Sequence, residues 1–310
     1  MSLDGRRVLV TGAGGFIGRH TVAALSGTGA TVLRSSRHES RPSPLSYPAD
    51  LLDDAAVARL VDRCQPHHVV HLAGSLGRGG QSFGELLLAN AAGTEILLAA
   101  LAARCPGVTS VVVVSSSAVY AAETGPLPES SRIGPSTGYG VSKAAQELVA
   151  ATWRARSAIR VLVVRPFNVV GPGQSAALAL SDFARQIATA ERGGPAEVRV
   201  GRLDARRDYV DVRDVAQALT LLADGQPGHD EYNVASGADR SVRDGLGVLL
   251  GLADRPIEVR ADPDRVRAEV QVQIGDSTRL RSETGWRPEV GFERSMADLL
   301  QHWRDRQETR

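Results

Sequence analysis

The sequence predicts an α/β protein in which a doubly wound parallel sheet of the Rossmann type is followed by a smaller mixed α/β C-terminal substrate-binding region. Three observations predict the sheet. Short uninterrupted Val/Leu runs recur through the first half, as in strands buried on both faces. Segments of helical period separate these runs, and a glycine-rich turn joins the first run to the first helix. We assign residues 1–166 to a dinucleotide-binding domain and 167–310 mainly to substrate binding, and the chain is allowed to cross back between them.

The elements of the first half follow from this alternation. Each strand is a short run of β-branched and apolar residues, and each helix is a longer segment whose apolar residues repeat every three to four positions. The glycine-rich turn opens the first helix, which runs to about residue 26. Strands are expected at 7–10, 31–33, 68–71, 110–114 and 160–164, and further helices at about 53–64, 83–104 and 139–156.

The pattern changes after Pro166, where the segments become shorter and arginine and proline become more frequent. This is typical of a less regular region packed on the strand ends, which is a suitable place to hold a substrate. Helices are expected there at about 178–192, 212–223, 241–252 and 292–305, and brief strands at 197–200 and 232–234.

The composition is that of an ordinary soluble globular protein, with 43% hydrophobic and 23% charged residues in a chain of 310. The 36 basic and 35 acidic residues leave a formal charge of +1, which argues against a nucleic-acid partner or a polybasic membrane patch. Cys64 and Cys105 are too few for a disulfide framework, so a reduced, cytoplasmic compartment is expected.

Other features of the sequence argue against a membrane span, a secretory signal and a metal site. The apolar stretch from Leu86 to Ala103 contains polar and charged residues, which predicts an amphipathic helix and not a membrane span. The first residues carry no apolar segment of the kind found in secretory signals. The histidines at 67, 68 and 71 flank an apolar run without the spacing of zinc ligands, so strand-edge histidines are favoured and no metal site is expected.

The glycine-rich turn carries the first functional signal. Gly12, Gly15 and Gly18 follow a strand and open a helix, as in turns that bind dinucleotides. The first glycine allows a tight turn, the second lets the backbone approach a pyrophosphate, and the third allows close packing of helix on strand. The free N–H groups and the dipole at the start of the helix favour the diphosphate.

The end of the second strand indicates which dinucleotide is preferred. A site that prefers NAD holds the ribose 2′-hydroxyl with an acidic residue at this place. This chain has Ser36 and Arg37 there, and its first acid is Glu39. A hydroxyl and a guanidinium suit a 2′-phosphate, so NADP(H) is favoured and NAD(H) remains possible. A solvated basic loop in an arginine-rich protein is the alternative.

The strongest signal is the pair Tyr139 and Lys143. Lys143 is the only lysine among the 36 basic residues, and it lies four positions after a tyrosine within a predicted helix. That spacing puts both side chains on one helical face, where an ammonium lowers the pKa of a phenol towards neutral pH. The phenol can then exchange a proton with a sugar or alcohol oxygen. The serines at 115–117 end a buried strand, and one of them could bind the same oxygen.

Together, these motifs resemble the extended short-chain dehydrogenase/reductase family, whose members modify nucleotide sugars, over essentially the whole chain. They occur in the family's order: TGxxGxxG at 11–18, DLLD at 50–53, HLAG at 71–74, Asn with GT at 90–94, SSS at 115–117, YxxxK at 139–143, RPFN at 165–168 and RDYVDVRD at 207–214. The resemblance implies a catalytic triad of Ser116, Tyr139 and Lys143. The expected cofactor site comprises Gly12, Gly15, Phe16, Ile17, Gly18, Ser36, Arg37, Asp50 and Leu51 beside the adenine, Leu72, Ala73, Gly74, Asn90 and Pro166.

Within the family, several stretches are similar to those of GDP-4-keto-6-deoxy-D-mannose reductases, among them 139–147, 165–174, 182–187 and 200–208. By this similarity Asn168 and Gln174 lie near the sugar diphosphate, and Arg207 and Arg267 supply cations to its phosphates. Ser117 is the remaining candidate at the substrate and the alternative to the preceding serine in the triad.

The reactions of the family can be separated by what this chain lacks. Dehydratases place an Asp–Glu pair after the catalytic hydroxyl, where this chain has Ser117 and Ala118, and epimerisation at carbons 3 and 5 needs an extra Cys or Lys in the pocket. We therefore expect NAD(P)H-dependent reduction of the 4-keto group of a nucleotide-diphosphate 4-keto-6-deoxyhexose, most simply GDP-linked. Tyr139 would protonate the ketone oxygen, Ser116 would polarise the carbonyl, and Lys143 would hold the nicotinamide ribose.

Two other functions stay open. One is an NAD-dependent nucleotide-sugar 4-epimerase that acts through a transient ketone, and the other is a non-catalytic dinucleotide sensor, against which the intact triad argues. The helices at 83–104 and 139–156 have wide apolar stripes. In this family such helices often form a four-helix dimer interface, so a homodimer is expected, with burial inside the monomer as the alternative.

Overall fold

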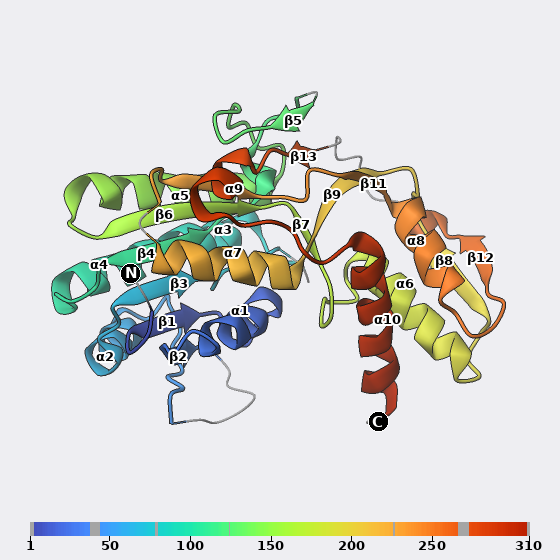
Figure 1. The fold of residues 1–310 in the computed structure, drawn as a ribbon, viewed down its shortest axis with the longest axis horizontal. Coiled ribbons are helices and arrows are strands. Elements are labelled where there is room, and N and C mark those ends of the chain that lie inside the picture. The colour runs from blue at the N-terminus through green and yellow to red at the C-terminus, as the bar shows by residue number, and fades with distance from the viewer. Residues whose placement is uncertain are drawn as a thin grey trace.

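The computed structural model describes residues 3–37, 44–77, 80–123, 125–225, 227–265 and 273–308. Its main sheet has six parallel strands in the order β10-β6-β4-β3-β1-β2 (Figure 1). These strands are β1 (Arg7–Thr11), β2 (Thr31–Ser35), β3 (His68–His71), β4 (Ser110–Val114), β6 (Arg160–Pro166) and β10 (Glu231–Val234). The helices packed with them are α1 (Phe16–Ser26), α2 (Asp54–Cys64), α3 (Phe83–Leu87), α4 (Gly93–Arg104), α5 (Gly138–Arg156), α7 (Val212–Asp224) and α9 (Thr278–Thr284).

The sheet buries both of its faces because side chains alternate along each strand. In β1, Val8 and Val10 belong to one hydrophobic cluster, which α1 and α7 complete, whereas Leu9 belongs to the cluster formed with α2, α4 and α5. All three side chains are fully buried. The predicted doubly wound parallel sheet is therefore confirmed.

The strand order reverses between β1 and β3, which are hydrogen-bonded neighbours. From β1 the chain first moves outward to β2, and it then returns to continue through β3, β4 and β6 on the other side. Parallel sheets of this type bind ligands at the carboxyl ends of the strands at such a reversal. The turn after β1 and the loop after β3 meet at this point.

The C-terminal part forms a smaller mixed region beside the main sheet (Figure 1). Its strands are β7 (Asn168–Val170), β9 (Arg206–Asp211) and β11 (Asp239–Ser241) in one sheet, and β8 (Glu197–Val200) and β12 (Glu258–Ala261) in a second. In a third sheet, β13 (Ile274–Gly275) pairs with β5 (Pro126–Leu127) of the first half of the chain. The helices of this region are α6 (Ala179–Glu191), α8 (Val242–Gly251) and α10 (Phe292–Glu308). Phe183 of α6, Leu246 of α8 and Met296 of α10 belong to one shared hydrophobic core. Between them the chain returns to the main sheet, because α7 packs on α1 and β10 pairs with β6.

The predicted uninterrupted helix over 83–104 differs from the structure. A π-helical turn, η1 (Leu88–Ala92), separates α3 from α4. The wider turn accommodates one extra residue and places Asn90, which is fully buried, inside the protein. By length and composition the Phe83–Arg104 segment could cross a membrane, but its Leu97, Leu98 and Leu101 are buried in the core, as in the core helix of a globular protein.

Candidate active site

The glycine turn after β1 has the geometry of a dinucleotide cradle. Gly12 has φ +68°, and a Cβ on it would lie 2.7 Å from the backbone nitrogen of Ala73. A Cβ on Gly18 would lie 2.1 Å from the carbonyl oxygen of Gly12. Because Gly15 caps α1 without a side chain, the first N–H groups of the helix are left for an anion. Phe16 and Ile17 begin the helix and are partly buried. These features fit a dinucleotide diphosphate.

The residues expected around the adenosine follow β2 or precede α2. Ser36 follows β2, and its hydroxyl lies 3.6 Å from the position that a Cβ on Gly14 would take. Arg37 is exposed beside it. Asp50 is also exposed and accepts a hydrogen bond from the backbone N–H of Leu52 at 3.1 Å. Leu51 is 9% exposed and belongs to the hydrophobic core.

The loop after β3 lies against the glycine turn. Leu72 and Ala73 are partly buried, and the backbone N–H of Leu72 donates to the carbonyl oxygen of Thr11 at 3.2 Å. The side chain of Asn90 fixes this loop: its Oδ1 atom accepts a hydrogen bond from the backbone N–H of Ser75, and its Nδ2 atom donates to the carbonyl oxygen of Ser75. A Cβ on Gly74 would lie 2.5 Å from the Asn90 Oδ1 atom. The structure thus places the buried Asn90 in contact with the loop at Gly74 and Ser75.

The start of helix α5, which carries Tyr139, lies beside the short turn that follows β4. Thr137 caps the helix by accepting a hydrogen bond from the backbone N–H of Gly140 at 3.0 Å. A Cβ on Gly140 would lie 2.3 Å from the carbonyl oxygen of Ala118, so the helix touches the short 3₁₀ turn η2 (Ser117–Val119). Ser116 caps that turn with its side chain. The start of α5, which carries Tyr139, therefore lies against the turn that Ser116 caps, and Ser117 is buried.

Lys143 lies one turn further along α5 and is 7% exposed. Its Nζ atom donates to the carbonyl oxygen of Val114, at the end of β4, and to Oε1 of Gln146, both at 2.8 Å. Burial lowers the pKa of Lys143 to about 8, although the charge of Glu147 opposes this shift. The amine therefore changes charge near neutral pH.

A buried polar network connects the strand before the glycine turn to α5. His71 bonds Thr11 through Nδ1 at 2.7 Å and Thr94 through Nε2 at 2.9 Å. Burial, assisted by the charge of Lys143, lowers the pKa of His71 to about 3. His71 is therefore neutral across the physiological range. Among the described residues, no group of His, Cys, Asp and Glu has the arrangement of a metal site.

The buried His71 predicts a specific pH dependence of stability. Its pKa of about 3 in the folded protein lies below the unfolded value of 6.5, so only the unfolded state gains a proton between these values. The free energy of unfolding should therefore fall by about 1.4 kcal/mol for each pH unit below 6.5 through this residue. Urea denaturation of the wild type and of His71→Gln from pH 7 to 5 measures the difference. Parallel stability curves for the two proteins would contradict this expectation.

The predicted substrate residues lie on the smaller sheet and the loop after it. Asn168 on β7 is in register with Tyr209 on β9, and Arg207 lies two positions before that tyrosine, so the three side chains share one face. Asn168 also donates to the carbonyl oxygen of Asp208 at 3.2 Å. Gln174 is 5% exposed; its Nε2 atom donates to Val169, and its buried Oε1 atom has no hydrogen-bond partner among the residues that the structure describes.

Pro166 and Arg267 are the remaining predicted site residues. Pro166 ends β6 and is buried, in register with Val234 of β10. Arg267 lies outside the residues that the structure describes.

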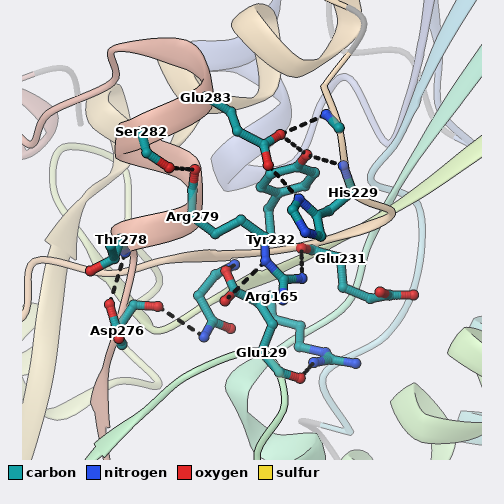
Figure 2. Close-up of polar contacts among 12 residues, drawn as sticks. Glu129, Arg165, His229, Glu231, Tyr232, Asp276, Thr278, Arg279, Ser282 and Glu283 are labelled. Atoms are coloured by element: carbon teal, nitrogen blue, oxygen red, sulfur yellow. Dashed lines mark hydrogen bonds and ion pairs between the residues drawn. The ribbon is translucent and has the colours of Figure 1, made fainter.

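A second group of polar contacts lies around β6 and β10 of the main sheet and involves α5, α9 and the loop at 129. Arg165 on β6 pairs with Glu147 on α5 and donates to the carbonyl oxygen of Glu129 at 3.1 Å. Figure 2 shows Arg279 of α9 between Glu129, 3.6 Å away, and the backbone of Glu231, to which it donates at 2.9 Å. These contacts fasten α9 and the loop at 129 to the edge of the main sheet.

The sequence motifs did not reveal Gln146 or the joining role of Thr94. Both are fully buried, and Gln146 contacts the amine of Lys143 directly. One signal was present, because Gln146 follows the only lysine by three positions and so shares its helical face. Thr94 could not be connected with either residue before the helices were placed side by side.

The comparisons with known proteins agree with this geometry. The model of the "NAD dependent epimerase/dehydratase family" matches residues 8–235. The chain is 36% identical over 309 residues to GDP-6-deoxy-D-mannose reductase of Pseudomonas aeruginosa, covering 97% of this chain and 98% of that protein.

Two solved structures have a similar fold over nearly the full length. The structure of RMD from Pseudomonas aeruginosa complexed with NADPH has a TM-score of 0.85 at 34% identity and covers 97% of this chain and 99% of that one. The UDP-glucose 4-epimerase of Thermus thermophilus in complex with NAD has a TM-score of 0.84 at 28% identity and covers 96% and 99%. The chain therefore belongs to the NAD dependent epimerase/dehydratase family of extended short-chain dehydrogenases/reductases.

Proposed function

We propose that the protein reduces the 4-keto group of a nucleotide-diphosphate 4-keto-6-deoxyhexose, GDP-linked, with NADPH as the reductant. The observation that carries the proposal is that α5, which holds Tyr139 and Lys143, contacts both the turn capped by Ser116 and, through the Lys143 amine, the end of β4. The 36% identity to a GDP-6-deoxy-D-mannose reductase over 97% of this chain supports the substrate class.

Each member of the triad has a defined task in this reaction. NADPH, when bound, supplies the hydride that reduces the ketone carbon. Tyr139 donates its phenolic proton to the ketone oxygen, while the hydroxyl of Ser116 donates a hydrogen bond to the same oxygen. The positive charge of Lys143, fixed on the carbonyl of Val114, stabilises the phenolate that remains. The helix α1 would hold the cofactor diphosphate at its first N–H groups.

The residues that follow β2 and β4 favour a reductase over the other reactions of the family. Ser117 and Ala118 follow the catalytic serine, where a dehydratase needs an acid pair. Ser36 and Arg37 follow β2 and suit the 2′-phosphate of NADPH, a cofactor that must exchange freely for net reduction. The 4-epimerase is the second candidate, because a UDP-glucose 4-epimerase has the same fold over nearly its full length.

The test is a direct assay of the purified protein. We expect NADPH absorbance to fall with a GDP-linked 4-keto-6-deoxy sugar, faster than with the dTDP- or UDP-linked analogue and faster than with NADH. Interconversion of UDP-glucose and UDP-galactose with tightly bound NAD, without net oxidation of NADPH, would favour the epimerase instead. Binding of NADPH without turnover of any nucleotide sugar would favour a sensor.

The cofactor preference gives a second prediction. Arg37→Ala should weaken NADPH binding at least about tenfold, because a charge-assisted hydrogen bond to the 2′-phosphate is lost, and should leave NADH binding unchanged. Fluorescence titration with both dinucleotides measures this difference. Arg104→Ala, an exposed arginine at the far end of α4, is the matched control. Equal weakening of both dinucleotides in Arg37→Ala would contradict the proposed preference.

A homodimer fits the exposed apolar residues of three adjacent helical elements. Phe83, Leu88 and Leu148 are 49%, 52% and 71% exposed on α3, η1 and α5, which pack side by side. We infer that a second copy covers this face, as a solution mass of twice 32.8 kDa would indicate. A monomer mass would contradict it. The cytoplasmic location stays a prediction from composition.

A further inference from the structure

We propose that Gln146 is a positioning residue that fixes the amine of Lys143 and connects it, through Thr94 and His71, to the strand before the glycine turn. The sequence motifs of the triad do not include Gln146. The proposal rests on the proposed function only where it concerns turnover, and its main measurement needs neither cofactor nor substrate.

Both polar atoms of the Gln146 side-chain amide form hydrogen bonds. Gln146 is fully buried one turn after Lys143, and its Oε1 atom accepts a hydrogen bond from the ammonium at 2.8 Å. Its Nε2 atom donates to Oγ1 of Thr94, also at 2.8 Å. Because one end must accept and the other must donate, an amide fits this position and a carboxylate or an ammonium does not.

The neighbouring hydrogen bonds fix the direction of this amide. The hydroxyl of Thr94 donates to the carbonyl oxygen of Asn90 at 2.6 Å, so its oxygen must accept from both Gln146 and Nε2 of His71. We assign the proton of the neutral imidazole to Nε2 on this ground. Its Nδ1 atom then accepts from the hydroxyl of Thr11 at the end of β1. A flipped amide would set an N–H group against the ammonium and would leave its oxygen facing a hydroxyl that has already donated.

Within the part of the chain that the structure describes, the network leaves one ammonium hydrogen of Lys143 for a ligand. The other two are donated to Val114 and Gln146. A Cβ on Gly74 would lie 3.6 Å from the Nζ atom, so the loop that is expected to line the cofactor reaches the amine. We infer that Gln146 directs the remaining hydrogen towards this side.

The charged and titratable groups near the Lys143 amine are few among the described residues, so a change at Gln146 should be visible in the pKa of Lys143. Glu147 follows on the same helix and is paired with Arg165 of β6. His71 of β3 is neutral, and Tyr139 lies one turn before the amine on α5. A charge introduced at position 146 is therefore expected to act directly on Lys143.

The experiment uses the fact that Lys143 is the only lysine in the chain. In protein labelled with ¹³Cε-lysine, a single resonance reports the titration of this amine, near pH 8 in the wild type. Gln146→Glu should raise the pKa of Lys143 because it adds a negative charge, and Gln146→Leu should lower it because the charged form loses an acceptor. Each variant should change the proton affinity by about tenfold, in opposite directions.

Opposite shifts distinguish positioning from a general loosening of the core. Gln65→Leu is the matched control. It removes a glutamine whose Nε2 atom donates to the backbone carbonyl oxygen of Arg104, near the amino ends of the strands, and it should leave the titration of Lys143 unchanged. Equal pKa values in all proteins, or shifts of one sign in both Gln146 variants, would overturn the proposal. If Gln146→Leu does not fold, Gln146→Glu decides alone, since an unchanged pKa there also overturns it.

Cofactor binding supplies a second measurement. Gln146→Leu should weaken NADPH binding about tenfold, as expected for one hydrogen bond to a charged group, while Gln65→Leu should not. If no 4-keto sugar is reduced by the wild type but the opposite pKa shifts are found, the proposed function fails and the role of Gln146 stands. If the sugar is reduced and the shifts are missing, the reverse holds.

Discussion

Tyr139→Phe is expected to lower the turnover number of the proposed reduction by about 10²–10⁴-fold, the usual contribution of a positioned general acid. The variant removes one oxygen and keeps the ring, so α5 and its contact with the 3₁₀ turn at Ala118 should persist. The ketone oxygen would then have to take its proton from water. The hydrogen bond from Ser116 would remain and would account for the residual rate.

The expected signature is a loss of turnover without a loss of binding. Stopped-flow measurement of NADPH oxidation gives the rate, and fluorescence titration gives the dissociation constant of NADPH, which should stay within about twofold of the wild type because the diphosphate is held elsewhere. Tyr47→Phe, at a tyrosine that packs against Arg63 and not against the triad, is the matched control. A Tyr139→Phe enzyme with nearly full turnover would show that another group protonates the oxygen.

The features that the sequence predicted correctly are those encoded by neighbours in the chain. The glycine turn is a local pattern, because Gly12 and Gly18 meet within one strand–turn–helix unit. Tyr139 and Lys143 share a helical face whatever the rest of the fold does. The general rule that parallel strands end at one edge of the sheet places the serines at 115–117 near α5, but the choice of Ser116 among them came from the resemblance to the family and stays a prediction.

The features that were missed depend on contacts between distant segments. Gln146 on α5 meets Thr94 on α4 only because the two helices pack together on one face of the sheet. The π-helical turn that buries Asn90 breaks the helical period by one residue, which a regular pattern does not reveal. The two-residue strands β5 and β13, 148 positions apart at their first residues, pair because of tertiary structure and carry no periodic signal of their own.

Glu147→Ala is expected to reduce the free energy of unfolding by about 3–5 kcal/mol, because it leaves a buried charge without its partner. Arg165 is 5% exposed, and its Nε and Nη2 atoms donate to the two carboxylate oxygens of Glu147 at 2.9 and 2.7 Å. Its Nη1 atom donates to the hydroxyl of Tyr120 and to the carbonyl oxygen of Glu129, which are neutral acceptors and do not compensate for a lost carboxylate. Urea denaturation with a constant m value would measure the loss.

Two control measurements test whether the loss of stability comes from the burial of the charge and not from the loss of an ion pair alone. Asp62→Ala breaks the Arg104–Asp62 pair, in which both side chains are about half exposed, and should cost less than about 1 kcal/mol because water screens and replaces the interaction. The double variant Glu147→Leu/Arg165→Met removes both charges, so it should recover most of the stability that Glu147→Ala loses. If Glu147→Ala cost no more than Asp62→Ala, water would have to reach Arg165 in solution. The anchoring of α5 on β6, which holds Lys143 in place, would then depend on apolar packing alone.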